Sequence, residues 1–321
     1  MLPEALKEAI ARRVEGLSRT EIAQRAEKLS EHYRRGRTSK IVGDPLDVAA
    51  YLLVRMPATY AATYAVLSEV ALRAPSFAPT QSLDAGAGPG TASWAAAATW
   101  PDIGTVRMLD SNPQFLQIAR TLTSEVAHPQ ALAKPQIVTR DLGSAPLASA
   151  DLVIAGYALA EMAPERLTPT VLSLWDACTG ILVLIEPGTP DGFERIRAAR
   201  AALLVQGARI IAPCPHQLAC PIVAPDWCHF SQRLPRLRDH MLAKSATVPF
   251  EDEKYSYVAA AREGVAIERY AARVVGPVGR NKAAITLKLC EGGEIRTRVI
   301  ASRDRGNFSR HRRIEWGDAV E

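Results

Sequence analysis

Long apolar runs and an apolar leader are both absent from this sequence of 321 residues. No stretch of about eighteen apolar residues occurs, which argues against a transmembrane helix. The first residues, MLPEALKEAIARRVEG, carry early acids and form an amphipathic pattern rather than the apolar centre of a secretory signal. Internal repeats and low-complexity segments are lacking as well. Together with a hydrophobic content of 48%, these absences predict a globular, monomeric protein of the cytoplasm that does not associate with membranes.

Cysteine is scarce, with five residues in the chain, yet its distribution is uneven. Cys214, Cys220 and Cys228 lie within fifteen residues, in CPHQLACPIVAPDWCHF, and Cys290 follows after sixty-one more. A reducing cytosol does not preserve disulfides, and grouped thiolates usually bind a soft metal or an iron–sulfur cluster. Structural zinc sites favour ligand pairs two to four residues apart, and this spacing is wider. The pattern favours a 4Fe–4S cluster on these cysteines, with zinc as the second interpretation and buried apolar thiols as the third.

Acidic residues are rare in residues 296–313, although the net charge of the chain is only +5. Between residues 296 and 313, Asp304 is the single acid among seven arginines, which are Arg296, Arg298, Arg303, Arg305, Arg310, Arg312 and Arg313. Smaller basic groups occur at 34–40 and 233–238. Guanidinium groups suit phosphate, so three such groups predict nucleic-acid binding, with solvated surface charge as the alternative.

The hydrophobic pattern changes twice along the chain. Helical spacing dominates residues 1–78, with two helical stretches meeting near Pro57. Short apolar runs then alternate with helical segments, which is typical of a parallel α/β sheet; we expect strands at 82–86, 106–110, 136–141, 151–157, 180–188, 208–213 and 255–261. From residue 268 the pattern is of strands, with Gly292 and Gly293 as a hairpin turn. We therefore predict a helical domain at 1–78, an α/β domain at 79–267 with a cysteine-rich insertion at 213–245, and a small β module with a basic tail at 268–321.

A glycine-rich loop connects the first expected strand to a helix. It begins at Asp84 and contains Gly86, Gly88 and Gly90, residues that allow a tight turn and a close approach of the backbone to a ligand. Dinucleotide-binding enzymes use similar loops, so the loop alone is a weak signal.

Acidic residues at the ends of the following strands favour S-adenosylmethionine as the ligand. Asp84 could bind its methionine amino group, Asp110 its ribose hydroxyls and Asp141 its adenine amino group, and Tyr157 could lie beside them. Asp110 alone would suit the ribose of NAD equally well, and each aspartate could instead cap a helix. The combination predicts an α/β class I S-adenosylmethionine-dependent methyltransferase (Rossmann-like) fold with the helical, cysteine-rich and β additions described above.

Residues for the methyl-transfer step itself are not evident. Amino-methylating enzymes commonly carry an Asn/Asp-Pro-Pro-aromatic run after the fourth strand, and residues 155–161 read AGYALAE instead. Tyr157 and Glu161 could face the ligand, whereas Cys178 is expected in the core. His216 and His229 lie within the cysteine segment and are expected as donors around the ligands. The sequence thus predicts cofactor binding, and it assigns no catalytic residue.

Several stretches together resemble one family, the methyltransferase-like proteins associated with the small ribosomal subunit. They are RMPATYA at 55–61, the glycine loop at 84–90, EPGTP at 186–190, the cysteine segment with DWCHF at 226–230, Cys290 and WGD at 316–318. The resemblance covers nearly the whole chain, and EPGTP and WCHF are its most specific motifs. It implies a role in assembly or maturation of the small ribosomal subunit with binding to its rRNA. It also implies a 4Fe–4S cluster on Cys214, Cys220, Cys228 and Cys290.

Two alternatives to this function remain open at the level of sequence. One is an active S-adenosylmethionine-dependent rRNA methyltransferase that uses Tyr157 or Glu161 near the methyl group. The other is an RNA-binding module that zinc stabilises and that has no cofactor function.

Overall fold

The computed structural model describes residues 2–34, 42–126, 132–143, 146–236, 238–243 and 247–321. The chain begins with four helices, which are α1 (Glu4–Val14), α2 (Arg19–Arg34), α3 (Pro45–Val54) and α4 (Met56–Arg73). Asp44 caps α3 by accepting hydrogen bonds from the amides of Leu46 and Asp47, each at 2.9 Å. The junction between α3 and α4 lies beside Pro57, as expected from the sequence. Of the basic group at 34–40, residues 35–40 lie outside the described residues.

The central sheet contains β1 (Gln81–Ala85), β2 (Thr105–Asp110), β3 (Gln136–Thr139), β4 (Ala150–Gly156), β5 (Cys178–Pro187), β6 (Arg209–Ala212), β7 (Phe230–Pro235) and β8 (Phe250–Ala261). Its order is β3-β2-β1-β4-β5-β8-β6, with β7 pairing to β8. The first five strands are parallel, and β8 runs antiparallel to β5 and β6. This is the Rossmann-like class I methyltransferase fold, and the prediction from the sequence is confirmed.

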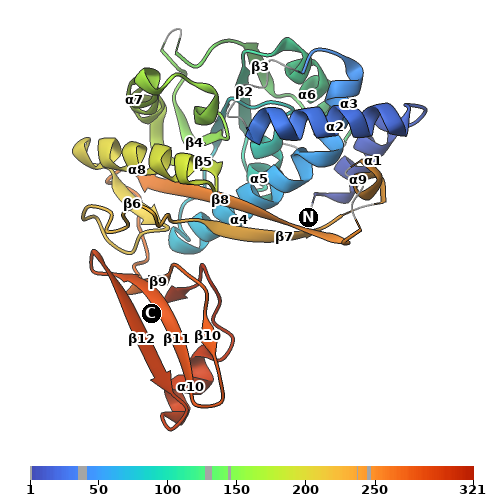
Figure 1. Ribbon diagram of the computed structural model, residues 1–321. Helices are drawn as coiled ribbons and strands as arrows, with labels where there is room; N and C mark the ends of the chain where they lie inside the picture. Colours follow the sequence, from blue (N-terminus) through green and yellow to red (C-terminus); the bar gives the residue numbers. More distant parts are fainter. Residues whose placement is uncertain (1, 35–41, 127–131, 144–145, 237, 244–246) are drawn as a thin grey trace.

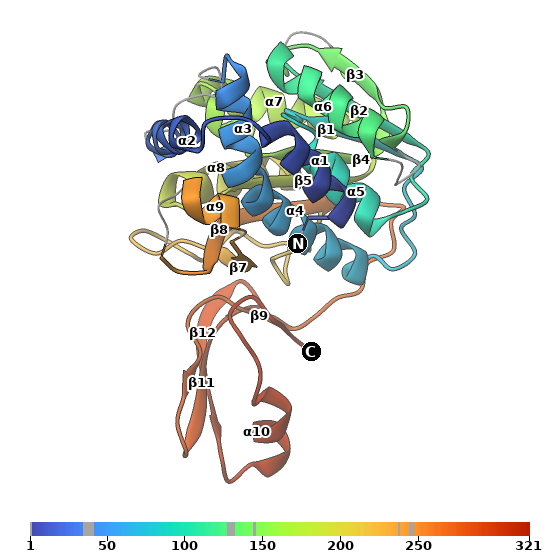
Figure 2. The ribbon, with the colours of Figure 1, turned by 90° about the vertical axis from the view of Figure 1, so that its right-hand side faces the viewer.

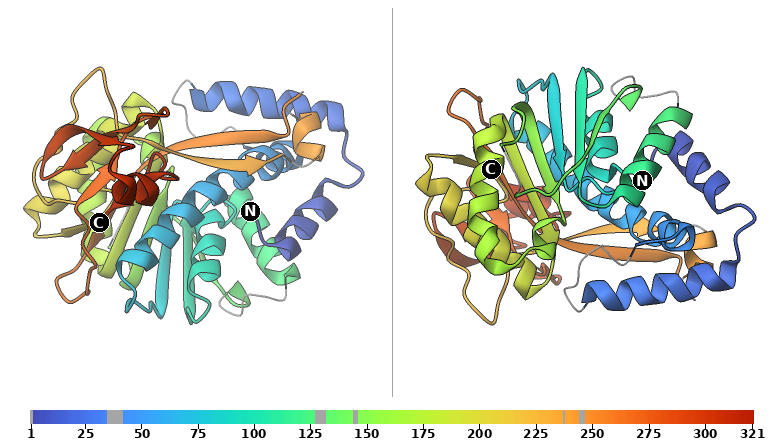
Figure 3. Two further views of the ribbon diagram at one scale, coloured as in Figure 1. Left: turned by 90° about the horizontal axis from the view of Figure 1, so that it is seen from below. Right: turned by 90° about the horizontal axis from the view of Figure 1, so that it is seen from above.

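Helices cover both faces of this sheet (Figures 1 and 3). On one face, α4, α5 (Thr91–Thr99) and α6 (Pro113–Glu125) share a hydrophobic core with the strands and with α1. On the other, α7 (Leu167–Ala177) and α8 (Pro190–Val205) form a second core around Trp175. The N-terminal helices thus share a core with the sheet, and the boundary expected at residue 78 stays a prediction.

The strand β8 is longer than the pattern at 255–261 predicts. Its first half begins at Phe250, extends beyond β5 and pairs with β7, from Phe230 opposite Tyr255 to Pro235 opposite Phe250. The acidic sequence FEDEK has low strand propensity, so pairing with β7 rather than its own composition makes it a strand. This two-stranded arm runs alongside α4 and ends near the short helix α9 (Arg238–Ala243) (Figure 1).

The C-terminal residues form a separate β module below the sheet (Figures 1 and 2). It consists of β9 (Ala272–Val274), β10 (Gly279–Arg280), β11 (Ala284–Glu291), β12 (Glu294–Ala301), α10 (Arg305–His311) and β13 (Ala319–Val320). Gly292 and Gly293 connect β11 to β12 with φ angles of 58° and 85°, which is the left-handed geometry that a two-residue hairpin turn needs. The module has its own core, which includes Ile285, Leu287 and Leu289.

Candidate functional site

The glycine loop lies at the carboxyl ends of β1 and β2, where open α/β sheets bind ligands. Gly86, Gly88 and Gly90 have φ angles of 80°, 54° and 86°, a region that other residues rarely adopt. A Cβ atom on Gly86 would lie 2.5 Å from the Cβ of Ala158, in the loop after β4. The loop therefore needs glycine both for its backbone angles and for its contact with the next loop.

Asp110, at the end of β2, is hydrogen-bonded to the backbone of the glycine loop. Its Oδ2 accepts a hydrogen bond from the amide of Gly88 and its Oδ1 one from the amide of Asn112, both at 2.8 Å. The carboxylate is 8% exposed and lines the cavity above the loop. Burial raises the pKa of Asp110, and the backbone hydrogen bonds act against that rise. A buried acid at the end of the second strand can bind vicinal ribose hydroxyls.

Asp84 has different surroundings from those expected. Its Oδ2 accepts from the amide of Ser93 at 2.9 Å and from the Ser93 hydroxyl at 2.8 Å, so it caps the first turn of α5. Burial raises its pKa to about 7. Asp84 is not among the residues that line the cavity, and its observed partner is the helix.

Asp141 and Tyr157 both line the cavity. Asp141 is exposed, and its Oδ1 pairs with Arg166 Nη2 at 2.6 Å. Tyr157 follows β4 directly and has a φ angle of 61°, which is uncommon for a bulky residue. Its hydroxyl donates to Glu253 Oε1 at 3.1 Å, and Glu253 also pairs with Arg55 at 3.4 Å.

One cavity of about 610 Å³ collects most of the predicted cofactor residues. Gly86, Gly88, Asp110, Asp141 and Tyr157 line it, whereas Asp84 and Gly90 do not. The N-terminal helices supply one wall of the cavity, where Tyr51 and Arg55 lie. These two residues were not predicted, because the prediction considered only the loops at the ends of the strands. The motif RMPATYA marks that wall in the sequence.

The four predicted metal-binding cysteines meet at the junction between the sheet and the C-terminal module. Cys214, Cys220 and Cys228 line a small cavity together with Cys290, which comes from β11 of the module. Burial and the neighbouring thiols raise the pKa of Cys228 well above its usual value, and the same causes raise the pKa of Cys290 to about 12. Cys178, by contrast, is buried at the start of β5 in the second core.

Two buried cations and one imidazole accompany these thiols. Arg200 and Arg273 are 4% and 3% exposed, and both favour the thiolate form of Cys214 and Cys290. His216 Nδ1 accepts from the amide of Leu218 at 3.2 Å, so its Nε2 carries the proton and donates to Cys290 Sγ at 3.3 Å. These contacts join distant segments, which explains why spacing alone did not reveal the arginines.

A thiolate at this site needs positive charge nearby, because burial disfavours its charged form. Arg200 fits that need, since its Nε is buried with no hydrogen-bond partner in the part of the chain that the structure describes. Within the same residues, no three His, Cys, Asp or Glu side chains are grouped as ligands of a metal ion. The four sulfurs line one cavity with cations beside them, but in the described residues they do not lie close enough together to form a metal site.

The arginines of the C-terminal tail are spread over the surface of the module. Arg296 and Arg298 lie on β12 and pair with Glu294 and Glu291, at 2.9 and 2.8 Å. The other five, Arg303, Arg305, Arg310, Arg312 and Arg313, lie in or beside α10 and are exposed. Tail arginines of this kind can reach a polyanion without disturbing the core of the module.

Comparison with known proteins finds curated relatives of this chain. The human mitochondrial ribosome assembly protein METTL17 is 28% identical over 289 residues, which are 84% of this chain and 61% of that protein. The mitochondrial Rsm22-cox11 tandem protein 2 of Schizosaccharomyces pombe is 33% identical over 218 residues, 61% of this chain and 29% of that protein. The chain thus spans less than two thirds of the length of either relative.

A solved structure with a similar arrangement is magnesium protoporphyrin IX methyltransferase from Synechocystis PCC 6803 with bound SAH. It covers 74% of this chain and 94% of its own, at 16% identity and a TM-score of 0.45. In the described residues, no helix combines the length and the apolar character that crossing a bilayer requires.

The comparison overturns the expected cytoplasmic location. Both curated relatives are named as mitochondrial, and so is the matching family. The expectation was wrong because it rested on the lack of an apolar leader, and such a lack does not define a compartment. The model of the family described as mitochondrial small ribosomal subunit Rsm22 matches residues 45–321, so the chain belongs to the Rsm22 family.

Proposed function

We propose that this protein is an assembly factor of the small ribosomal subunit that binds rRNA through its C-terminal module. In this proposal S-adenosylmethionine occupies the cavity above the glycine loop, and a 4Fe–4S cluster on Cys214, Cys220, Cys228 and Cys290 joins the module to the sheet. The name of the human relative, a ribosome assembly protein, supports the role in assembly. The basic tail supports the contact with RNA.

The meeting of four thiols from two parts of the fold is the observation that carries the proposal. Three of them come from the segment after β6, and Cys290 comes from β11. A bound cluster would supply four metal–sulfur bonds across this junction, so its binding free energy would also stabilise the position of the module. Arg200 and Arg273 would offset the negative charge of the thiolate ligands.

Metal analysis tests this part of the proposal. Anaerobically purified protein should contain iron and labile sulfide and should absorb broadly near about 400 nm. Replacing Cys290 with serine should lower the iron content and expose the module to protease, whereas Cys178→Ser should leave the iron content unchanged. Colourless wild-type protein with one zinc ion per chain would favour the zinc-stabilised module instead.

Salt dependence tests the contact with RNA. Each phosphate that an arginine neutralises releases counterions, so affinity should fall steeply as salt rises. Replacing Arg310, Arg312 and Arg313 together by alanine should reduce the slope of log affinity against log salt by about two to three. Binding of S-adenosylmethionine should be unchanged, since none of these three arginines lines the cavity above the glycine loop. An unchanged slope would mean that these arginines are only solvated.

Methyl transfer to rRNA is the second candidate, and two features of the cavity favour it. Tyr157 holds a strained φ angle directly after β4, and such strain gathers at functional sites. Glu161 also lines the cavity. Incubation of small-subunit rRNA with labelled S-adenosylmethionine separates the two candidates, because an assembly factor without methyl transfer leaves the RNA unlabelled.

A further inference from the structure

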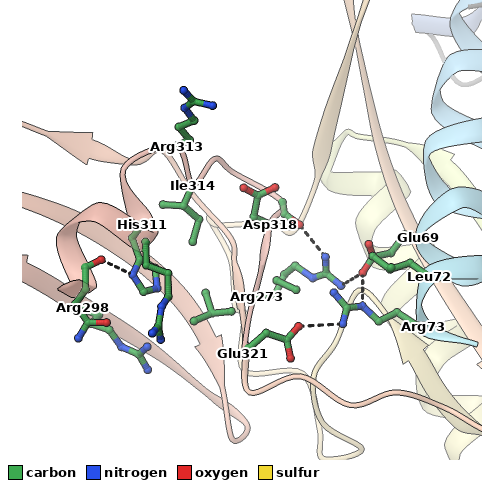
Figure 4. A pocket seen from close by; sticks show the side chains of 15 residues that line it. Glu69, Leu72, Arg73, Arg273, Arg298, His311, Arg313, Ile314, Asp318 and Glu321 are labelled. Carbon is green, nitrogen blue, oxygen red and sulfur yellow. Dashed lines mark hydrogen bonds and ion pairs between the residues drawn. The ribbon is translucent and has the colours of Figure 1, made fainter.

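A second large cavity lies between helix α4 and the C-terminal module (Figure 4). Its volume is about 570 Å³, which is within the usual range for a small-ligand site. Its two walls come from different parts of the chain. One wall contains Glu69, Leu72 and Arg73 of α4 with Arg273 of β9, and the other comes from β12, α10 and the residues that follow α10.

The α4 wall is an ion-pair network whose charges compensate one another. Glu69 Oε1 accepts from Arg73 Nε at 3.1 Å and from Arg273 Nη2 at 2.5 Å. Arg73 Nη1 also pairs with Glu321 at 3.3 Å. Two cations therefore face two carboxylates, and Figure 4 shows the four side chains meeting on this side. This wall offers little net charge to a ligand.

The module wall carries an excess of positive charge. Arg310 and Arg313 are exposed, and the described residues supply neither side chain with a hydrogen bond or an ion pair. Arg298 of β12 lines the same cavity and pairs with Glu291 at 2.8 Å. The acids on this wall are Asp318, whose Oδ2 accepts from the amide of Glu315 at 2.8 Å, and Glu321, which pairs with Arg73. An anionic ligand would therefore place its charge against Arg310 and Arg313.

Apolar side chains lie next to these cations. Leu72 on α4 is 57% exposed and lines the cavity. Ile314 lines the same cavity from the module side. Proteins that bind single strands combine cations for the phosphates with a side-chain surface for the bases; that surface is commonly aromatic, and here it is aliphatic.

We propose that this cavity receives an unpaired nucleotide of an RNA strand. Its phosphate would contact Arg310 and Arg313, and its base would lie against Leu72 and Ile314. A base within a duplex is stacked and cannot enter a cavity between two walls, so single-stranded RNA is the ligand class. This inference rests on the proposed RNA binding and adds to it the type of RNA and the part of α4 that takes part.

Two matched pairs of variants test the inference in the full-length protein. Arg310→Ala with Arg313→Ala removes two exposed charges at the cavity, and Arg12→Ala with Arg120→Ala removes the same charge from exposed positions of α1 and α6, outside the basic tail. Leu72→Asp adds an acid at the cavity, and Val205→Asp adds one at an exposed aliphatic residue of α8. Binding is measured by fluorescence anisotropy with an unstructured oligoribonucleotide and with a duplex of the same sequence.

The cavity variants should each weaken binding of the single strand by about tenfold or more, the effect of losing one charge-assisted contact. The control variants should change it by less than about threefold. Equal losses in the two arginine pairs, or a duplex bound as tightly as the single strand, would overturn this inference while RNA binding itself stands. A wild-type protein with no affinity for either RNA would overturn the proposed function as well. Circular dichroism and S-adenosylmethionine binding show that each variant is folded.

Discussion

At the scale of single residues, Asp110 is the side chain on which the cofactor cavity depends most directly. It lines the cavity, and it holds the amide of Gly88 at 2.8 Å. Replacing Asp110 with alanine should weaken S-adenosylmethionine binding by about 1.5–3 kcal/mol, because charge-assisted hydrogen bonds are lost. Titration calorimetry measures the effect, with Asp102→Ala as an exposed control. Wild-type protein that binds NAD more tightly than S-adenosylmethionine would contradict the assignment of the cavity.

Asp84 makes the stability of the protein depend on pH in an unusual direction. Burial raises its pKa from 3.8 to about 7 in the folded chain, so folding favours the protonated carboxyl. Its contribution to stability is fully present below about pH 4 and is lost as the pH rises to about 7; the loss is up to about 4 kcal/mol. Denaturant unfolding of the wild type and of Asp84→Asn should show this, because the asparagine oxygen still accepts from Ser93 and does not ionise.

The difference in unfolding free energy between Asp84→Asn and the wild type should grow in favour of the variant from pH 4 to pH 8. Burial also raises the pKa of Glu186 to about 7, so part of the pH dependence should remain in the variant. Parallel curves for the two proteins across this range would show that Asp84 ionises normally.

Residue types were easier to predict from the sequence than residue partners. The grouping of the four cysteines could be predicted, because their number and spacing are visible without the fold. All four line one cavity in the structure. The buried cations Arg200 and Arg273 were not predicted to join them, since they come from α8 and β9 and approach only through tertiary packing. From the sequence, Asp84 could either bind the cofactor or cap a helix. In the structure it accepts a hydrogen bond from the amide of Ser93, so it caps the helix.

At the scale of elements, the contact between the glycine loop and the loop after β4 sets the shape of the cofactor cavity. Gly86 and Gly16 form a matched pair for testing it, with φ angles of 80° and 78°. A Cβ on Gly86 would meet Ala158 at 2.5 Å, whereas a Cβ on Gly16 would meet nothing within 4 Å. Alanine at either position carries a similar backbone strain of about 1 kcal/mol.

Gly86→Ala should therefore destabilise the protein by about 1–3 kcal/mol more than Gly16→Ala does, because two loops must separate. It should also weaken S-adenosylmethionine binding, which Gly16→Ala should leave unchanged. Thermal unfolding and calorimetry on both variants provide the two readings. Equal destabilisation would mean that the strain of the φ angle explains the whole effect.

The elements of the sheet could be predicted because apolar runs and turn residues alternate regularly between residues 81 and 213. The arm formed by β7 and the first half of β8 could not. The segment Phe250–Lys254 is acidic, and β7 ends at Pro235 inside the cysteine-rich region, so neither has the composition of a strand. Their pairing with each other supplies the hydrogen bonds that composition does not indicate.

At the scale of the whole molecule, a buried ion network connects the C-terminal module to the body. The network centres on Glu69 of α4, which accepts from Arg73 at 3.1 Å and from Arg273 at 2.5 Å. Tyr270 lies between the same two arginines, with their guanidinium carbons at 4.5 and 4.4 Å from its ring centre. Arg273 also donates to the carbonyls of Pro213 and Gly317, at 3.1 and 2.8 Å, so it contacts both sides of the junction.

Replacing Glu69 with glutamine should therefore loosen the module. Arg73 and Arg273 are 7% and 3% exposed, and a buried cation that loses its carboxylate typically destabilises a protein by about 3–5 kcal/mol. The remaining contacts of Arg273 with two carbonyls should reduce that loss to about 2–4 kcal/mol. Glu194→Gln is the matched control, because Glu194 pairs with Arg197 on the exposed face of α8, and this substitution should cost about 0.5 kcal/mol or less.

Hydrogen exchange should then rise in residues 272–320 of the Glu69 variant and stay slow in β1 and β4. Faster exchange throughout the sheet would show instead that the module and the body unfold together, and that Glu69 stabilises the whole chain rather than the junction.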